Sequence, residues 1–379
     1  MLQNKIYQNF IVEIIRTLLI ILFVLSLVAL TVRAVNFLDL IVENGYNVST
    51  YFKYSFLNIF GLAPKFIPLS FLIALLIFIL RHKNDSEFVI LWTSGVKKIQ
   101  LVHLLFFSSV FVLIIYIFLS AFLTPAALNK SRQLLSEDQL NSFLPTVKTK
   151  QFSDSFKGFT FIVEKKINNE IKNIFLHDTG KNLKNLSPNI SDELQTTVVA
   201  EKGIIKERKM FLFNGQIIST KGSNEETEIL KFEQLNIDLG ELATTTIKQP
   251  KLQETSTFEL VSCLLPDKFI SKFCKRGINE EIFPILIRRI ILPFYIPVIS
   301  LICSFLLLKN QKIYSNKISI FIYSFIILLF TELFIRYTGL SYILRIFYII
   351  LPVVLCFFFY FLLNYKFSRE TLKYEKFSI

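Results

Sequence analysis

Six long stretches of this chain contain no charged side chain. They cover residues 17–32, 66–80, 99–129, 290–308, 318–331 and 346–365. A helix that crosses a membrane needs about 20 mostly apolar residues, and about 17–25 are tolerated. The third, fourth and sixth stretches reach that length unaided, and the other three reach it when a flanking charged side chain extends to the membrane interface. The sequence therefore predicts six transmembrane helices.

The alternative is a large soluble protein with an all-helical core. Most of its helices would need a polar stripe on the side that faces water, and residues 18–30 and 104–123 offer none. Apolar residues make up 53% of the chain and charged residues only 19%, whereas a soluble globular domain carries about 25% charged residues. The composition thus favours a membrane protein.

Residues 126–275 differ from the rest of the chain because they are rich in Lys, Asn, Glu and Thr. β-branched and aromatic residues dominate in 159–164, which is typical of a strand. Asn214-Gly215 lies between two apolar runs and predicts a hairpin turn, and a slip in the alternation of apolar residues over 230–239 predicts a bulge. This region therefore reads as an all-β sandwich or jelly roll.

The predicted fold class is an integral membrane protein with six transmembrane α-helices in a 3+3 arrangement and an inserted, jelly-roll-like all-β domain. Residues 1–125 hold the first three helices, 126–275 the β domain, and 276–379 the last three helices and a tail.

The distribution of positive charge predicts the topology. Lys and Arg are in excess in the loops at 81–98 and 309–317 and in the tail after residue 365, and cytoplasmic loops carry such an excess. Both termini are then cytoplasmic, and the β domain lies on the other side of the membrane. The net charge of +13 is for the most part a topology signal, so we expect no nucleic-acid partner.

Sequence motifs for catalysis are missing. The chain contains no phosphate-binding loop, no H-E-x-x-H and no C-x-x-C, and the histidines His82, His103 and His177 are not spaced as metal ligands. We expect no enzyme activity, no metal and no cofactor, with ATP bound by a partner subunit if transport is active. Cys263 and Cys274 fall outside the cytoplasm, where a disulfide between them is an open alternative.

A short amphipathic helix is predicted in the cytoplasmic loop at about 85–94. Asp85 or Ser86 can cap its first turn, Phe88 lies on one face with the apolar residues three and four positions later, and Gly95 can end it. Two interpretations remain, a helix at the lipid interface or a helix that docks on a cytoplasmic motor. The candidate coupling residues are Ser86, Glu87, Phe88, Leu91, Trp92 and Gly95.

Several arginines gather at the outer ends of the predicted spans. The guanidinium group matches phosphate in a two-pronged geometry, so these side chains suit a lipid with a phosphorylated head group. The alternatives are contacts with ordinary phospholipids, or internal pairing of Glu332 with Arg336 and of Glu281 with Arg288. The candidate substrate-binding residues are Arg33, Arg288, Arg289 and Arg336.

The whole chain resembles the permease subunits of the bacterial lipopolysaccharide export transporter, the LptF/LptG (YjgP/YjgQ) family. The local anchors are Ser86-Glu87 with Gly95 eight residues later, the segment 280–293, and the segment 152–178. Residues 159–178 look more like the LptF branch.

The resemblance implies a subunit of an ABC transporter in the bacterial inner membrane that serves outer-membrane biogenesis. Its partners would be a second six-span, LptG-like permease, a cytoplasmic LptB-like ATPase dimer and a single-span, LptC-like protein with a periplasmic jelly roll. ATP-driven closure of a cavity between the permeases would push lipopolysaccharide into the periplasmic β domains. Glu87 would contact the ATPase and Arg33 the substrate, whereas the other three arginines follow from charge placement alone.

Two other functions remain open on the sequence. One is a permease for a different lipid or a lipoprotein, and the other is a membrane-anchored periplasmic scaffold or sensor. A scaffold needs neither an amphipathic cytoplasmic helix nor arginines at the outer ends of its spans, so binding of a cytoplasmic ATPase separates these hypotheses.

Overall fold

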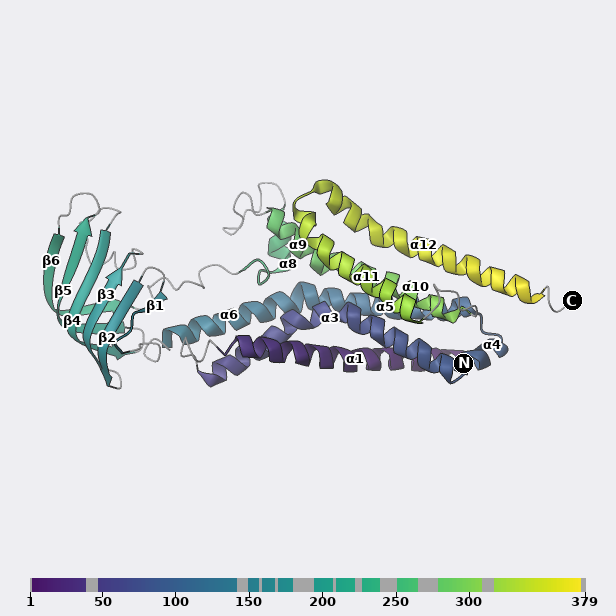
Figure 1. Ribbon diagram of the computed structural model, residues 1–379, viewed down its shortest axis with the longest axis horizontal. Coiled ribbons are helices and arrows are strands. Elements are labelled where there is room, and N and C mark those ends of the chain that lie inside the picture. The colour runs from purple at the N-terminus through teal and green to yellow at the C-terminus, as the bar shows by residue number, and fades with distance from the viewer. Residues whose placement is uncertain are drawn as a thin grey trace. The chain divides into compact units, whose positions relative to one another are not determined.

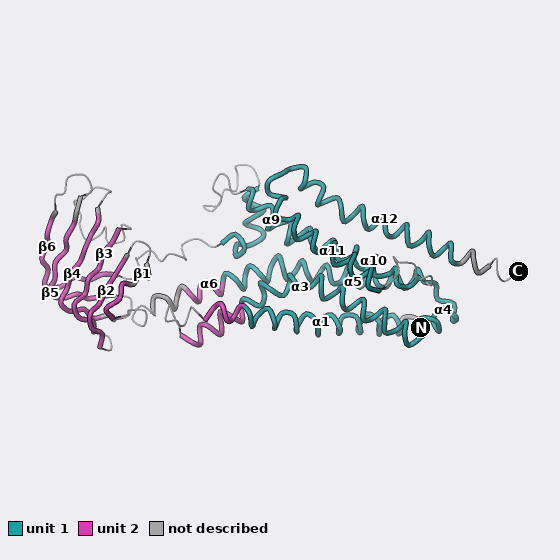
Figure 2. Tube along the Cα trace, viewed as in Figure 1, with its two compact units in different colours: residues 1–32, 58–129, 251–379 teal, residues 33–57, 130–250 magenta. Residues whose placement is uncertain are grey.

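The computed structural model of the protein describes residues 2–38, 47–141, 149–156, 159–167, 170–179, 194–206, 209–221, 227–238, 251–264, 279–308 and 317–375. The chain divides into two compact units (Figure 2). The helical unit contains residues 1–32, 58–129 and 251–379, and the β unit contains residues 33–57 and 130–250.

The helical elements follow the order of the predicted spans (Figure 1). They are α1 (Leu2–Asn36), α3 (Val48–Asn84), α4 (Glu87–Thr93), α5 (Lys98–Phe118), η1 (Leu119–Leu123), α6 (Thr124–Asn141), α8 (Thr257–Ser262), α9 (Asn279–Ile290), η3 (Leu292–Phe294), α10 (Tyr295–Ser304), η4 (Phe305–Leu307), α11 (Lys317–Ile335), η6 (Arg336–Gly339) and α12 (Tyr342–Glu375). Among the described residues, six helical segments are long and apolar enough to cross a membrane: Lys5–Asn36, Val48–Asn84, Lys98–Leu135, Glu280–Leu307, Lys317–Gly339 and Tyr342–Glu370. The prediction of six spans is confirmed.

Proline or a π-helix lies within four of these spans, among them the sixth, with Pro352 inside α12. Pro64 and Pro68 lie inside α3, and the fourth span is broken into α9, η3 and α10 at Pro293. The third span passes through the π-helix η1 between α5 and α6. Proline removes a backbone hydrogen-bond donor, and neighbouring side chains can satisfy the backbone groups that such breaks release. Thr124 Oγ1, for example, donates to the Phe60 carbonyl at 2.7 Å.

Helix α10 forms the centre of the helical unit. All ten of its residues are buried, and it packs against α5, α11 and α12. By contrast, only 11%, 22% and 17% of the apolar windows of α1, α11 and α12 are buried. Exposed apolar surface of this extent is covered by lipid or by another protein in a membrane.

The β unit contains six strands. They are β1 (Ser153–Phe156), β2 (Phe159–Ile167), β3 (Glu170–Asp178), β4 (Leu194–Lys206), β5 (Lys209–Lys221) and β6 (Thr227–Asp238). Each strand pairs antiparallel with the next, in the order β1-β2-β3-β4-β5-β6. The all-β prediction is confirmed, and within the described residues the strands make one up-and-down sheet, without a second sheet packed against it.

The predicted hairpin at Asn214-Gly215 is wrong because β5 continues through both residues. Asn214 has the left-handed φ of 52° that favours a turn, but neighbouring strands hold β5 on both sides. Toward β6, Phe213 pairs with Gln234 and Gly215 with Phe232, so the register is the same before and after Asn214. Because the register does not shift, the bulge predicted in β6 is also wrong.

Left-handed residues do change the apolar pattern of β3 and β5. In β3, Asn173 also has a left-handed φ, of 51°, and the buried side chains on either side of it, Ile171 and Ile174, are three residues apart instead of two. Left-handed residues in β3 and β5 thus move the apolar side chains back to one face of the sheet. That face carries a single core with members from β2 to β6.

Candidate functional site

The helix α4 connects α3 to α5 and has well-defined ends. Ser86 precedes it with a left-handed φ of 59° and makes no side-chain capping bond, so the predicted cap at Ser86 is wrong. At the other end Gly95 has φ +92°. The Gly95 N–H donates to the Trp92 carbonyl at 3.2 Å, and the Val96 N–H donates to the Leu91 carbonyl at 3.1 Å. This pair of bonds is a Schellman motif, and it confirms that Gly95 ends the helix.

The apolar face predicted for docking is turned toward the protein's own core. Phe88 is only 1% exposed, and Leu91 and Trp92 are partly buried against the same core. The exposed side chains of α4 include Val89, at 50%, and Ile90, at 66%. Sequence reasoning missed these two residues. The five residues 88–92 are all apolar, so apolar side chains remain on the outside of the helix whichever of its faces packs against the core.

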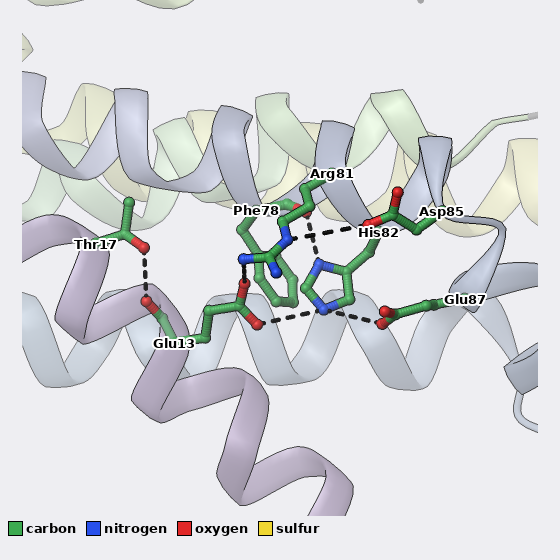
Figure 3. Close-up of polar contacts among 7 residues, drawn as sticks. All are labelled: Glu13, Thr17, Phe78, Arg81, His82, Asp85 and Glu87. Atoms are coloured by element: carbon green, nitrogen blue, oxygen red, sulfur yellow. Dashed lines mark hydrogen bonds and ion pairs between the residues drawn. The ribbon is translucent and has the colours of Figure 1, made fainter.

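A buried histidine joins α4 to two other helices (Figure 3). His82 in α3 is 4% exposed. Its Nε2 lies 3.4 Å from Glu13 Oε2 of α1 and 3.3 Å from Glu87 Oε2 of α4, and its Nδ1 lies 3.0 Å from the Phe78 carbonyl oxygen. Arg81 NH1 lies 3.2 Å from the other oxygen of Glu13. From the sequence Glu87 could be assigned a role but no partner, because the three helices meet only in the folded chain.

A groove lies beside the end of α4, between it and α12. Residues 95–99 and Phe367 are part of its lining. The Lys98 ammonium lies 2.5 Å from Glu370 Oε2 of α12 and 4.7 Å from the centre of the Trp92 ring. The groove and the exposed side of α4 form a continuous surface at the basic end of the helical unit.

At the opposite end of the spans, Arg288 pairs with an unexpected partner. Its NH2 lies 2.8 Å from Glu332 Oε2, so neither of the alternative pairs, Glu281 with Arg288 and Glu332 with Arg336, forms in this structure. Arg288 and Arg289 line the same pocket, which has a volume of about 70 Å³. This volume holds water molecules and is too small for a sugar phosphate.

Arg289 is a structural side chain. It is 4% exposed, and its guanidinium donates to the carbonyls of Gln253 at 2.8 Å and Thr255 at 3.1 Å and to Thr257 Oγ1 at 2.9 Å. Thr257 Oγ1 in turn donates to the Ala121 carbonyl of the π-helix η1 at 2.6 Å. The donors of the Arg289 guanidinium are thus directed into the protein, which favours a structural role over the predicted contact with substrate.

The other two candidate arginines are exposed. Arg336 lies in η6 of the helical unit, one turn after Glu332. Arg33 lies near the end of α1, in the part of that helix that belongs to the β unit. Both guanidinium groups are accessible to a ligand.

The described residues include three cysteines, one of them in a disulfide. Cys263, after α8, is disulfide-bonded, and Cys274 lies outside the described residues. Cys303 and Cys356 are free and lie in spans, as predicted. In the described ranges no group of three or more His, Cys, Asp and Glu side chains could hold a metal ion.

The family of this chain is shown by a match over nearly its whole length. The family described as lipopolysaccharide export system permease LptF/LptG matches residues 10–366. The chain belongs to the LptF/LptG family. No curated protein matches it. Membership confirms the resemblance that the sequence indicated and makes the chain a multi-pass inner-membrane permease subunit of lipopolysaccharide export rather than a catalytic enzyme.

Proposed function

We propose that this permease is one of two six-span subunits of an ABC transporter that extracts lipopolysaccharide from the outer leaflet of the inner membrane. A separate cytoplasmic ATPase dimer supplies the energy and binds the ATP, and the permease itself uses no cofactor. The lipid leaves through the β unit toward a periplasmic jelly-roll protein. Within the family we assign the chain to the LptF branch, on the resemblance of residues 159–178.

The proposed topology has both termini in the cytoplasm and the β unit in the periplasm. The excess of Lys and Arg in the loops at 81–98 and 309–317 supports it. The disulfide at Cys263 gives independent support, because disulfides persist in oxidising compartments such as the periplasm. Residues 126–275 then carry the part outside the cytoplasm, between two sets of three spans.

The observation that carries the coupling function is the two-sided packing of α4. Phe88 fixes the helix to the core of the helical unit, and Val89 and Ile90 remain exposed at the basic end of the spans. Glu87 is half exposed and is accessible to a basic partner. A helix attached in this way transmits a displacement by the ATPase to the spans that it connects.

The substrate side combines exposed apolar surface with exposed arginines. The apolar side chains of α1, α11 and α12 suit acyl chains, and the guanidinium groups of Arg33 and Arg336 suit phosphates. Transport requires that these contacts be stronger in one conformation than in the other. Arg288 takes part through its pair with Glu332, which a phosphate can compete for.

Co-purification tests this function. Membranes are solubilised gently, and the ATPase that accompanies the tagged wild-type chain is quantified. Ile90→Asp and Glu87→Arg should each release most of the ATPase, because they place a charge in an apolar contact and reverse a charge in an ionic one. Ile167→Asp, an equally exposed isoleucine of β2, is the control and should retain it. A wild-type chain that brings down no ATPase would favour the scaffold hypothesis.

A further inference from the structure

The contacts of His82 suit a ring with a proton on each nitrogen. The Phe78 carbonyl oxygen can only accept, so Nδ1, 3.0 Å away, donates to it. Nε2 then faces the carboxylates of Glu13 and Glu87, at 3.4 and 3.3 Å, and ionised carboxylates also accept only. A neutral ring would direct a lone pair at two negative charges. The imidazolium form satisfies all three acceptors.

The charged groups around His82 are mostly carboxylates. Glu13 faces it from α1 and Glu87 from α4, and on its own helix Arg81 contacts Glu13 and lies 4.0 Å from Asp85. When the His82 ring is neutral, the charged groups around it are the three carboxylates of Glu13, Glu87 and Asp85 and the one guanidinium of Arg81. A proton on His82 offsets one of the two excess negative charges.

Aromatic rings enclose the imidazole and keep water away from it. The ring centres of Phe10, Phe78 and Phe88 lie 4.9, 4.3 and 5.5 Å from that of His82, and the Phe88 ring is stacked on it at 23°. These rings come from α1, α3 and α4. The imidazole is thus shielded from water, whereas the side chains of Glu13 and Glu87 stay 31% and 52% exposed, so each contact is partly screened by solvent.

We propose that His82 is a positioning residue for coupling, which holds Glu87 of α4 and Glu13 of α1 on one imidazolium so that α1 follows the movement of α4. This inference rests on the proposed function, because it assumes that an ATPase moves α4. The helix α1 has few fully buried side chains: only 11% of its apolar window is buried, and its buried apolar residues Phe10, Ile14 and Leu18 lie around Glu13 in the sequence.

Distance measurements between spin labels test the link directly. Cys303 and Cys356 are first replaced by Ala, and labels are placed at the exposed positions Val12 of α1 and Val89 of α4. In the full chain in phospholipid nanodiscs, with its ATPase bound, the wild-type distance distribution should be narrow. His82→Gln should broaden it.

The control is His103→Gln, because His103 is exposed and its hydrogen bond is to the Tyr360 hydroxyl, at 3.1 Å, away from α4. This variant should keep the wild-type distribution. Glu13→Gln provides a second route if His82→Gln does not fold, and it should broaden the distribution while α4 stays in place. A narrow distribution in both His82→Gln and Glu13→Gln would overturn the proposal.

Transport measured in proteoliposomes separates this inference from the proposed function. His82→Gln should retain the ATPase and its hydrolysis rate, while lipopolysaccharide transported per ATP falls about tenfold, the factor expected for one hydrogen bond to a charged group. Unchanged transport per ATP in His82→Gln would refute the role of His82 alone. Absence of ATP-dependent transport by the wild-type complex would refute the proposed function instead.

Discussion

Arg288 of α9 donates to Glu332 of α11 at 2.8 Å, and this pair joins two spans beside the small pocket at their end. Both side chains are partly exposed, at 33% and 44%. The pair is therefore accessible to competing anions, and its contribution to stability is small. It links α9 to α11.

A charge swap tests this pair. Arg288→Glu and Glu332→Arg should each lower transport, and the double variant should recover part of it because the pair is restored with opposite polarity. The coupling free energy for unfolding should be at most about 1 kcal/mol, as for exposed ion pairs. A double-mutant cycle of thermal unfolding in detergent measures it, and a double variant that transports no better than either single one would contradict a role for the pair.

Arg289 should contribute to stability rather than to substrate binding. Arg289→Met leaves the carbonyls of Gln253 and Thr255 without their charged donor, and we expect a loss of about 3 kcal/mol in the free energy of unfolding. The measurement is thermal unfolding of the purified chain in detergent. The matched control is the exposed Arg336, for which Arg336→Met should leave stability unchanged and weaken lipopolysaccharide binding. If Arg289→Met instead weakened lipopolysaccharide binding and left stability unchanged, Arg289 would be a substrate-binding residue.

Gly339 should not tolerate a side chain. A Cβ at this position would lie 2.0 Å from the Glu280 carbonyl oxygen, which is backbone of α9. Gly339→Ala therefore forces η6 away from α9 and should lower the free energy of unfolding by about 2 kcal/mol. Gly61→Ala is the control, since its Cβ would meet only the flexible end of Leu128 at 3.1 Å. Equal melting temperatures for the two variants would show that η6 and α9 are not in close contact.

Gly95 should matter for coupling because of its backbone conformation. There is open space around it, but its φ of +92° is unfavourable for a residue with a Cβ. Gly95→Ala should cost about 1 kcal/mol in the last turn of α4 and reduce the amount of ATPase that co-purifies. Gly95→Asn should be milder, because Asn tolerates left-handed φ better than Ala. If both variants bind ATPase equally well, the Schellman motif is not needed for docking.

The number of spans, the β insert and the end of α4 at Gly95 could be read from the sequence. Charge-free stretches, β-branched runs and a glycine after an apolar helix are local signals, and each acts through a neighbouring few residues. The signal at Asn214-Gly215 was local too, and it failed because pairing with β4 and β6 kept β5 extended through a left-handed residue.

The partners of the charged side chains were decided by the tertiary structure alone. Glu332 pairs with Arg288 instead of the nearby Arg336, and His82 meets a carboxylate from α1 and another from α4. The sequence determined which segments enter the membrane and which form strands, because burial of apolar side chains depends on composition and period. Only the packing of distant helices fixed which charges face each other, because an ionic contact requires its atoms within a few ångströms and residue order does not specify that distance.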